Sequence, residues 1–241
     1  VLILFLTTAM PAKTDLESSP DFNMGLVFRA GNIEIMFKDS ELINELAFMI
    51  LALKVDYELS DYVKLGAMAG YQQNHFNNPV DATTLPLSLR LEDEKSNSMM
   101  FGLSLETIPF SIDHFALNLN FQFNYFKSFL KEWDIDLPIE NGIAKTRNSF
   151  FSSRIDMLLS YDGFSSFTPF IGPNLHFVSG KLRFEETIAG LDVSEEQEYQ
   201  QNSLVGLSCG AKFEVGDHFD LTLRLNLFSE KSLYFTATYI F

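Results

Sequence analysis

Cysteine is almost missing from this chain, because Cys209 is the single thiol among 241 residues. One thiol cannot form an intramolecular disulfide, so a disulfide framework is excluded. Long apolar runs are missing too. No stretch of about 18 consecutive apolar residues occurs, and this excludes a transmembrane helix. Small disulfide-bonded domains and helical membrane proteins are therefore both ruled out as fold classes.

Basic residues are in short supply: 17 Lys and Arg stand against 32 Asp and Glu, and the formal net charge is −15. Nucleic-acid binding requires a basic surface, and a polybasic membrane-surface protein requires one as well. The sequence also has no G-x-S-x-G elbow, no glycine-rich phosphate loop and no His or Cys pair at metal-binding spacing. We therefore expect no nucleic-acid partner, no enzymatic activity, no cofactor and no metal.

Phenylalanine is abundant, with 25 residues, and the stretch 115–125 (FALNLNFQFNY) shows how it is used. Its odd positions are apolar or aromatic, and its even positions from 118 onward are Asn or Gln. Successive side chains of a strand point to opposite faces, so one face is apolar and the other carries amides. The length matches the roughly 9–11 residues of a tilted strand that crosses a bilayer. The pattern predicts a membrane strand with its amides turned inward; a soluble sandwich strand is the alternative.

The same alternation, with apolar residues at odd positions, continues along the chain from residue 47. The predicted strands cover 47–59, 63–71, 99–105, 115–125, 151–161, 167–177, 205–215, 219–227 and 233–241. The segment 21–37 completes the set, but its apolar parity changes near Gly31-Asn32. We interpret it as one bulged strand, with a tight hairpin as the alternative. Pro173 does not fit the middle of a strand, because it lacks a ladder donor.

The connections between these strands alternate in length. Short ones lie near 60, 113, 163 and 217, and long ones cover 72–97, 127–148 and 185–200. Short periplasmic turns and long extracellular loops are typical of transmembrane barrels. The sequence therefore predicts an all-β protein, a transmembrane antiparallel up-and-down β-barrel of about ten strands. Eight or twelve strands stay open, and twelve would require that both the hairpin at Gly31-Asn32 and the alternating segment 85–91 cross the membrane. We interpret 85–91 as an extracellular hairpin with the strand that begins at Met99.

The beginning of the chain differs from the rest. Residues 1–12 (VLILFLTTAMPA) form an apolar stretch followed by small residues, the pattern of the second half of a secretory signal. A buried apolar strand is the alternative. We expect residues 1–12 to be a residual signal peptide and residues 13–241 to form the barrel.

The final ten residues alternate and end in an aromatic residue. This stretch resembles the C-terminal signature of bacterial outer-membrane β-barrel proteins, and 168–172 (TPFIG) resembles a strand opening of small OmpA- and OmpW-type barrels. The resemblance implies a location in the outer membrane, with membrane lipids and the insertion machinery as partners, and we expect a monomer. It also assigns the assembly signal to Leu233, Phe235, Tyr239 and Phe241.

Even positions of the predicted strands should face the lumen. These polar residues are Lys54, Asp56, Glu58, Lys64, Glu106, Asn118, Asn120, Gln122, Asn124, Arg154, Asp156, His176, Lys212, Glu214, Asp220 and Arg224. Buried charges must be paired, and basic and acidic residues nearly balance in this set. We interpret the lumen as filled and salt-bridged; a narrow conduit or ligand pocket is the alternative.

The four histidines and the acidic stretch 185–198 are the remaining candidates for chemistry. His114 and His218 fall in predicted turns and His75 in a loop, whereas His176 should face the lumen with Asp156 as its hydrogen-bond partner. The acidic stretch is interpreted as a solvated extracellular loop; binding of an extracellular ligand or of Ca²⁺ is the alternative. We expect a structural or surface-exposed role. A narrow porin-like channel is the main rival, and a lipid-modifying enzyme or protease is a more distant one.

Overall fold

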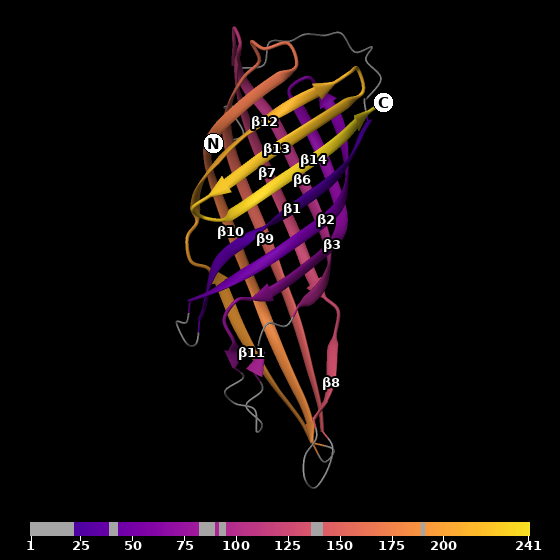
Figure 1. Ribbon diagram of the computed structural model, residues 1–241, viewed down its shortest axis with the longest axis vertical. Coiled ribbons are helices and arrows are strands. Elements are labelled where there is room, and N and C mark those ends of the chain that lie inside the picture. Colours follow the sequence, from indigo (N-terminus) through magenta and orange to yellow (C-terminus); the bar gives the residue numbers. More distant parts are fainter. Residues whose placement is uncertain (1–21, 39–42, 82–89, 92–94, 136–141, 189–190) are drawn as a thin grey trace.

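Long antiparallel strands make up almost all of the computed structural model, which describes residues 22–38, 43–81, 90–91, 95–135, 142–188 and 191–241 (Figure 1). The strands are β1 (Phe22–Phe37), β2 (Ile43–Ser60), β3 (Val63–Phe76), β4 (Val80–Asp81), β5 (Arg90–Leu91), β6 (Ser96–Ile112), β7 (Phe115–Ser128), β8 (Lys131–Ile135), β9 (Gly142–Tyr161), β10 (Phe167–Ile188), β11 (Leu191–Gln201), β12 (Val205–Val215), β13 (Phe219–Leu227) and β14 (Lys231–Ile240). The predicted segment 1–12 lies outside the described residues.

Ten of these strands close into a ring. Their order around the barrel is β1-β2-β3-β6-β7-β9-β10-β12-β13-β14, and β14 pairs with β1 from Asn23–Ile240 to Asn32–Lys231. All pairings in the ring are antiparallel. Each strand pairs with the next strand of the ring along the chain, and the pairing of the last strand with the first closes the barrel. The predicted fold class, an up-and-down barrel of ten strands, is confirmed.

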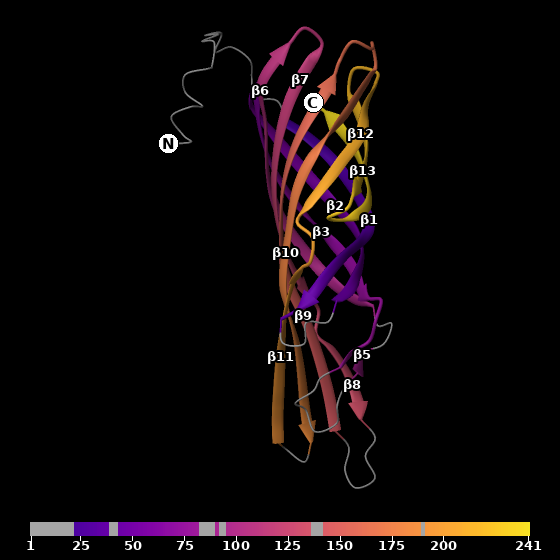
Figure 2. The same ribbon diagram turned by 90° about the vertical axis from the view of Figure 1, so that its left-hand side faces the viewer.

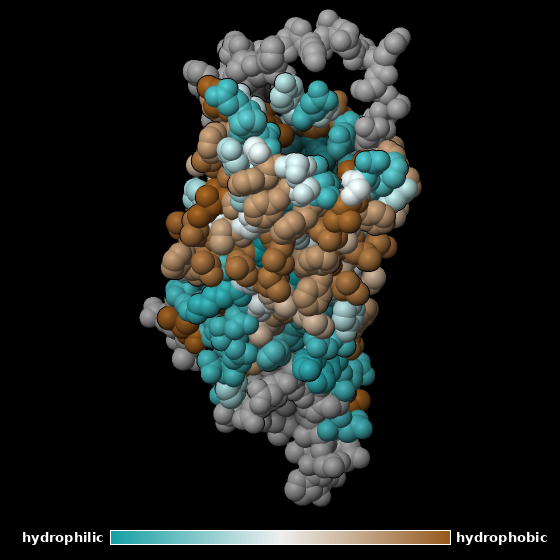
Figure 3. Space-filling model, turned by 45° about the horizontal axis from the view of Figure 1, so that its top comes forward, coloured by the Kyte–Doolittle hydropathy of each residue, from teal (hydrophilic) through white to brown (hydrophobic). Residues whose placement is uncertain are grey.

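The outer surface of the barrel is apolar. The inner surface is polar in the half of the barrel that lies nearer to the short turns. On β7, Phe123 is 49% exposed while its neighbour Asn124 is 2% exposed, and Leu103 on β6 is 64% exposed. Figure 3 shows the resulting apolar belt between two polar zones. Leu117 and Leu119 are only half-buried rather than fully outward, and they face the register shift of β6 between Thr107 and Phe110.

Aromatic side chains border this belt at both ends. At one end, rings from neighbouring strands contact each other in the pairs Phe22–Tyr57, Phe115–Tyr161, Phe167–Phe213 and Phe219–Tyr239, with centroids 5.0–5.2 Å apart. Toward the other end, Phe151 contacts Phe123 and Phe177. Aromatic girdles at the two interfaces are typical of barrels that cross a membrane.

The two ends of the barrel differ. At the turn side, short connections at 61–62, 113–114, 162–166 and 216–218 join the strands, and Asp113 (φ 50°) and Gly216 (φ 69°) adopt the left-handed conformation that tight turns use. At the opposite end, the extension side, β8, β9, β10 and β11 project beyond the other strands (Figure 2). This asymmetry places the turn side toward the periplasm. Among the described residues, no helix has the length and hydropathy to span a bilayer.

The prediction of a bulge in the first strand is wrong. β1 pairs with β2 in unbroken register from Phe22–Tyr57 to Met36–Ile43, and its odd positions face inward throughout. Ile33, Ile35 and Phe37 are therefore buried inside the barrel. The apolar parity changes because the lumen itself becomes apolar toward the extension side, and not because the strand is kinked.

The acidic stretch 185–200 is a hairpin and not a loop. β10 continues to Ile188, and β11 returns along it from Leu191–Ile188 to Gln200–Ser179. The alternating segment 85–91 also differs from its prediction: Arg90 and Leu91 pair with Val80 and Asp81, not with the strand at Met99, while 82–89 lies outside the described residues.

Pro173 has a local explanation. The ladder between β9 and β10 skips Gly172 and Pro173 and resumes at Asn174–Asp156, so the missing proline N–H removes no bond there. At Gly172, a Cβ atom would collide with the carbonyl oxygen of Met157. A proline next to a glycine is tolerated at this site because the two strands approach closely without pairing.

The number of strands changes along the barrel axis. In the turn-side half, β12, β13 and β14 lie between β10 and β1. Beyond the β13–β14 turn, β11 alone lies between β10 and β1. Its residues 199–201 pair with residues 35–37 of β1 on one side, and Gln200 pairs with Ser179 of β10 on the other. Within the described residues, the ring therefore narrows from ten strands to eight. Eight strands enclose an interior that side chains can fill.

Candidate functional site

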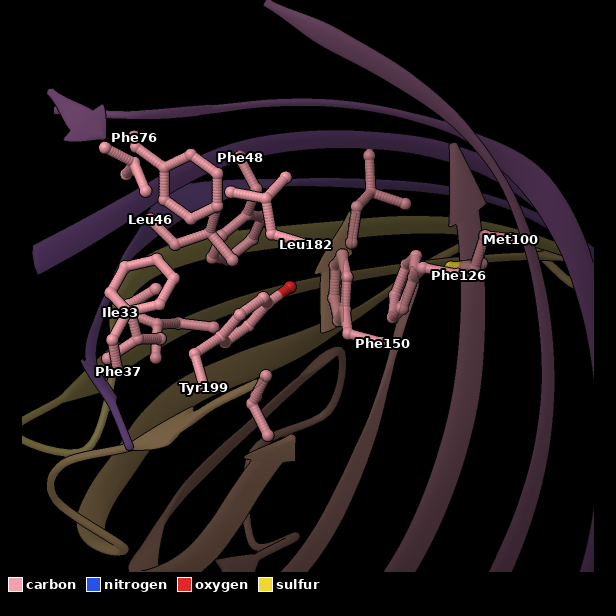
Figure 4. Packing of buried hydrophobic residues seen from close by; sticks show 14 of the residues in the cluster. Ile33, Phe37, Leu46, Phe48, Phe76, Met100, Phe126, Phe150, Leu182 and Tyr199 are labelled. Atoms are coloured by element: carbon pink, nitrogen blue, oxygen red, sulfur yellow. The ribbon is translucent and has the colours of Figure 1, made fainter. Parts of the chain in front are cut away.

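The interior of the barrel has three zones along its axis. A polar cavity opens at the turn side, a layer of buried charges follows, and an apolar cluster fills the half that eight strands enclose. The polar hollow at the turn-side mouth is visible in Figure 3, and the apolar cluster is shown in Figure 4.

The turn-side cavity has a volume of about 250 Å³. Its lining includes Asn23, Lys54, Asp56, Lys64, Glu106, Asn118, Asn120, Ser160, Thr168, Lys212, Asp220, Thr222, Arg224, Thr236 and Thr238, with a few apolar residues. Nine of the lumen residues predicted from the sequence lie on this wall, namely Lys54, Asp56, Lys64, Glu106, Asn118, Asn120, Lys212, Asp220 and Arg224.

Every lysine in the cavity wall has a carboxylate partner. Lys54 Nζ lies 2.9 Å from Asp56 Oδ1 and 3.7 Å from Glu106 Oε1. Lys64 Nζ lies 2.6 Å from Glu58 Oε1. Lys212 Nζ lies 2.8 Å from Asp220 Oδ2 and 3.8 Å from a carboxylate oxygen of Glu214 at the mouth. Because each charge is paired, the wall offers a balanced polar surface and not a site of one sign.

The amide row of β7 continues this polar wall. Asn118 Nδ2 donates to Ser160 Oγ at 2.8 Å, and Gln122 Nε2 donates to Asn124 Oδ1 at 3.4 Å. Asn124 is buried and Gln122 is half-buried. These amides bond to each other and to neighbouring strands across the lumen face.

Glu230 is the centre of the charged layer. It lies in the β13–β14 turn, is 1% exposed, and accepts hydrogen bonds from Arg29, with Nε to Oε1 at 2.9 Å and a second, shorter bond from Nη2 to Oε2. Arg154 Nη2 donates to Oε2 at 2.8 Å. His176 Nδ1 lies 3.2 Å from the same oxygen. Two arginines on opposite sides of the lumen thus hold one carboxylate.

A second carboxylate, Asp156, completes this layer. Arg224 Nη1 donates to Asp156 Oδ2 at 3.0 Å, and Ser208 Oγ donates to Oδ1 at 3.1 Å. The guanidinium of Arg224 also stacks over the ring of Tyr234, 4.5 Å from its centroid. The predicted partner of His176 was Asp156; the structure places Glu230 there instead. Glu230 falls in a turn, where strand alternation assigns no direction to a side chain.

Ser152 and Glu230 lie on either side of the His176 imidazole. Ser152 Oγ lies 2.9 Å from His176 Nε2, and His176 Nδ1 lies 3.2 Å from Glu230 Oε2. This order of hydroxyl, imidazole and carboxylate is the order of a nucleophile activated by a base. Two features argue against catalysis: both oxygens of Glu230 are already engaged by arginines, and Ser152 borders a void of only about 10 Å³. Among the described residues, only the contact between Ser152 and His176 is a hydrogen bond, because His176 Nδ1 has no hydrogen-bond partner despite its proximity to Glu230.

The apolar cluster closes the extension-side half. Tyr199 from β11 is fully buried, and its ring contacts Phe37, Phe76 and Phe150 with centroids 5.7–6.5 Å apart. Phe150 stacks on Phe126 at 4.4 Å. Figure 4 shows these rings meeting across the lumen from strands far apart in the sequence. The only polar group of Tyr199 is satisfied, because its hydroxyl donates to Asn148 Oδ1 at 2.8 Å.

The residues predicted as an assembly signal lie on the outer face of β14 or at its end. Leu233 and Phe235 are exposed, and Phe241 is 69% exposed. The Tyr239 ring contacts Phe219 and Phe241, with centroids 5.1 and 4.8 Å apart. The backbone N–H of Phe241 donates to the Phe22 carbonyl oxygen at 3.4 Å.

In the described part of the chain, no cluster of three or more His, Cys, Asp and Glu residues has the geometry to hold a metal ion. In the acidic hairpin, several carboxylates pair with basic side chains instead. Glu198 bonds to Lys38 at 2.8 Å, and Glu196 bonds to Lys181 at 2.6 Å.

No family model matches the sequence, and no curated protein matches it significantly. Solved structures of similar fold include the translocator domain of the autotransporter NalP from Neisseria meningitidis, at 9% identity and a TM-score of 0.46, over 100% of this chain and 95% of that one. The outer membrane protease OmpT from Escherichia coli aligns at 10% identity and a TM-score of 0.47, over 94% and 99%. An outer membrane channel from Pseudomonas putida F1 aligns at 8% and 0.44, over 96% and 99%.

These neighbours are similar in fold, and their different activities are their own. The closed ring and its apolar belt identify the chain as a transmembrane β-barrel, because only a barrel without open edges satisfies the strand backbone in lipid. The predicted outer-membrane β-barrel and its location in the bacterial outer membrane are confirmed.

Proposed function

We propose that the protein is a closed, non-enzymatic outer-membrane barrel that holds a charged sheet extension at the cell surface. The observation that supports this best is the filled interior. The charged layer around Glu230 and the apolar cluster around Tyr199 follow each other along the barrel axis, and the void between them measures about 10 Å³. A conduit for hydrated solutes needs continuous space, whereas a second void in the described part of the eight-strand half, beside Asn74 and Leu182, measures only about 30 Å³.

The extension supplies the surface-exposed part. β9 and β10 contain 20 and 22 residues, whereas about 9–11 residues suffice to cross the bilayer. Roughly half of each strand therefore stands outside the membrane, together with β8 and β11. The outer face of this extension carries charges of both signs, and Lys181 on β10 lies between Glu196 and Glu198 on β11. An extracellular ligand of this protein would meet these strands first.

The partners that we propose follow from the same surfaces. Outer-membrane lipids contact the apolar belt, and the insertion machinery engages the β14 strand before it pairs with β1. The protein is a monomer, since the ring satisfies its own strand edges within the membrane and requires no second copy.

Conductance in planar lipid bilayers tests the closed interior. We expect refolded wild-type protein to produce no stable current steps in 1 M KCl. The Phe150→Ala/Tyr199→Ala variant serves as the control, because it removes two rings of the apolar cluster and should raise the frequency of transient openings. Steady conductance of the wild-type protein that scales with salt concentration would overturn the proposal.

A narrow channel is the second candidate, and the open turn-side cavity favours it. If current flows, it must pass Arg224 on the cavity wall, so Arg224→Gln should then change the ratio of anion to cation permeability. The third candidate, an enzyme, rests on Ser152 and His176. A fluorophosphonate probe that labels the wild-type protein but not Ser152→Ala would support it, and the absence of labelling is what we expect.

A further inference from the structure

Basic side chains gather on one part of the outer surface, just beyond the belt. Lys127 on β7, Arg147 on β9, and Lys181 and Arg183 on β10 occupy odd positions, the outward parity of these strands. Neighbouring strands bring them together, since Lys127 and Lys181 both pair with Ser149. In a chain with a net charge of −15, four cations on three adjacent strands are a local exception.

Arg147 and Arg183 lie directly opposite each other in the β9–β10 ladder. Like charges at opposite positions of an antiparallel pair destabilise it, unless an anion lies between them. Arg183 Nε bonds to Glu185 Oε1 at 2.8 Å, and Lys181 bonds to Glu196 and Glu198. Within the described residues, neither Arg147 nor Lys127 has an ion-pair partner, and both are exposed.

The height of this group above the belt is set by the strands. Lys127 follows the belt residue Tyr125 by two positions, and Arg147 precedes the belt residue Phe151 by four. A strand rises about 3.3 Å per residue and is tilted by about 45°, so Lys127 and Arg147 begin roughly 5–9 Å beyond the aromatic rings, and Arg183, six positions after Phe177, begins about 14 Å beyond that ring. That is the level of lipid headgroups at the outer leaflet.

We propose that Lys127, Arg147 and Arg183 bind a phosphate group of an anionic lipid in the outer leaflet. A guanidinium presents a planar fork of donors that matches phosphate oxygens, and Lys127 adds a point charge. The phosphate removes the repulsion between the two arginines, while the acyl chains of the same lipid lie against Phe151 and Phe177. This site is independent of whether the lumen conducts.

The test uses the full chain in nanodiscs of phosphatidylcholine that contain either bisphosphorylated lipid A or its dephosphorylated counterpart. Native mass spectrometry measures the fraction of barrel that retains the lipid. We expect retention of the phosphorylated lipid alone, and about tenfold weaker retention in Lys127→Gln/Arg147→Gln, since each basic residue near the surface contributes a several-fold factor. The Arg147→Lys variant, which keeps the positive charge but loses the planar fork of donors, should retain the phosphorylated lipid more strongly than the double variant and less strongly than the wild-type protein.

Lys231→Gln is the matched control, because Lys231 is exposed on β14, away from β7, β9 and β10 in the ring, and its loss removes the same charge. Folding of each variant is checked by its heat-dependent shift on gels. Equal retention by wild type and the double variant, or equal retention of both lipids, would overturn the proposal. Inorganic phosphate that binds to the site without any retention of lipid A would overturn the lipid as its ligand.

Discussion

Arg29 and Glu230 lie 201 positions apart in the chain and form two hydrogen bonds inside the barrel. Arg29 belongs to β1, and Glu230 to the turn where β13 ends and β14 begins. This is the level at which the wall changes from ten strands to eight. The pair therefore ties the short β13–β14 hairpin to the strand along which it stops, and Arg154 reaches the same carboxylate from β9.

Glu230→Gln should strongly destabilise the barrel. The substitution leaves the guanidinium groups of Arg29 and Arg154 buried without their anion, and breaking a buried pair in this way costs about 3–5 kcal/mol. Glu196→Gln is the control, because that carboxylate is 45% exposed and its loss should cost less than about 1 kcal/mol. Urea unfolding in detergent micelles measures both. Similar midpoints for the two variants would show that Glu230 is dispensable.

The outward face of the barrel could be predicted from the sequence where amides alternate with apolar residues, because a barrel with Asn and Gln on its inner face must turn Phe121 and Phe123 toward lipid. The inward face could be predicted only where it is polar. On β1, Ile33 and Ile35 are apolar and point inward, and a pattern of apolar residues does not say which side of a wall they face. The narrowing of the ring, which makes an apolar interior stable there, arises from pairings between distant strands.

Glu230 and the β10–β11 hairpin were beyond sequence reasoning for a related cause. A turn has no period, so nothing in the sequence directs Glu230 inward toward His176. In β11, Glu195, Glu196 and Glu198 interrupt the apolar alternation that is typical of a membrane strand. This strand lies outside the membrane, so one of its faces is exposed to water and needs no apolar residues. Its strand character comes from pairing with β10.

Phe121→Arg should destabilise the barrel by about 2–4 kcal/mol, the cost of a charge on the lipid face near the midplane. Phe121 is exposed on the outer face of β7, in the middle of the belt. Phe129→Arg is the matched control, since Phe129 is exposed beyond the end of the same strand and its substitution should cost about 0–1 kcal/mol. Reversible unfolding in phospholipid vesicles gives the two values. An equally small cost at 121 would mean that this face does not contact lipid.

The β10–β11 hairpin should loosen in acid. Hydrogen bonds from Lys38 and Lys181 lower the pKa of Glu198 from its ordinary value of 4.5. A carboxyl group with a lowered pKa in the folded state contributes stability above about pH 4.5, and this contribution is lost as the pH falls through the folded pKa. Hydrogen exchange of the β11 amides, corrected for intrinsic rates, should therefore accelerate in that window.

Glu198→Gln should remove this pH dependence while leaving the exchange of β7 amides unchanged. At the alkaline end, the pKa of Lys181 is raised above 10.5 by Glu196 and Glu198, so its contribution persists to that pH and is lost only above it. A hairpin whose corrected exchange is the same at pH 3 and pH 7 would contradict a stabilising role for the Lys38–Glu198–Lys181 group.

Deletion of Phe241 should reduce assembly in cells much more than it reduces stability in detergent. In the finished barrel, this residue is largely exposed and contacts one ring, that of Tyr239, so its packing contribution is small. Before closure, β14 is an unpaired strand with alternating apolar side chains, which can add to the edge of another sheet. The expected role of Phe241 is to be recognised at that stage. Surface-exposed barrel per cell and the urea midpoint of refolded protein are the two measurements. Equal losses in both would make Phe241 an ordinary packing residue, and normal assembly without it would contradict its role as a signal.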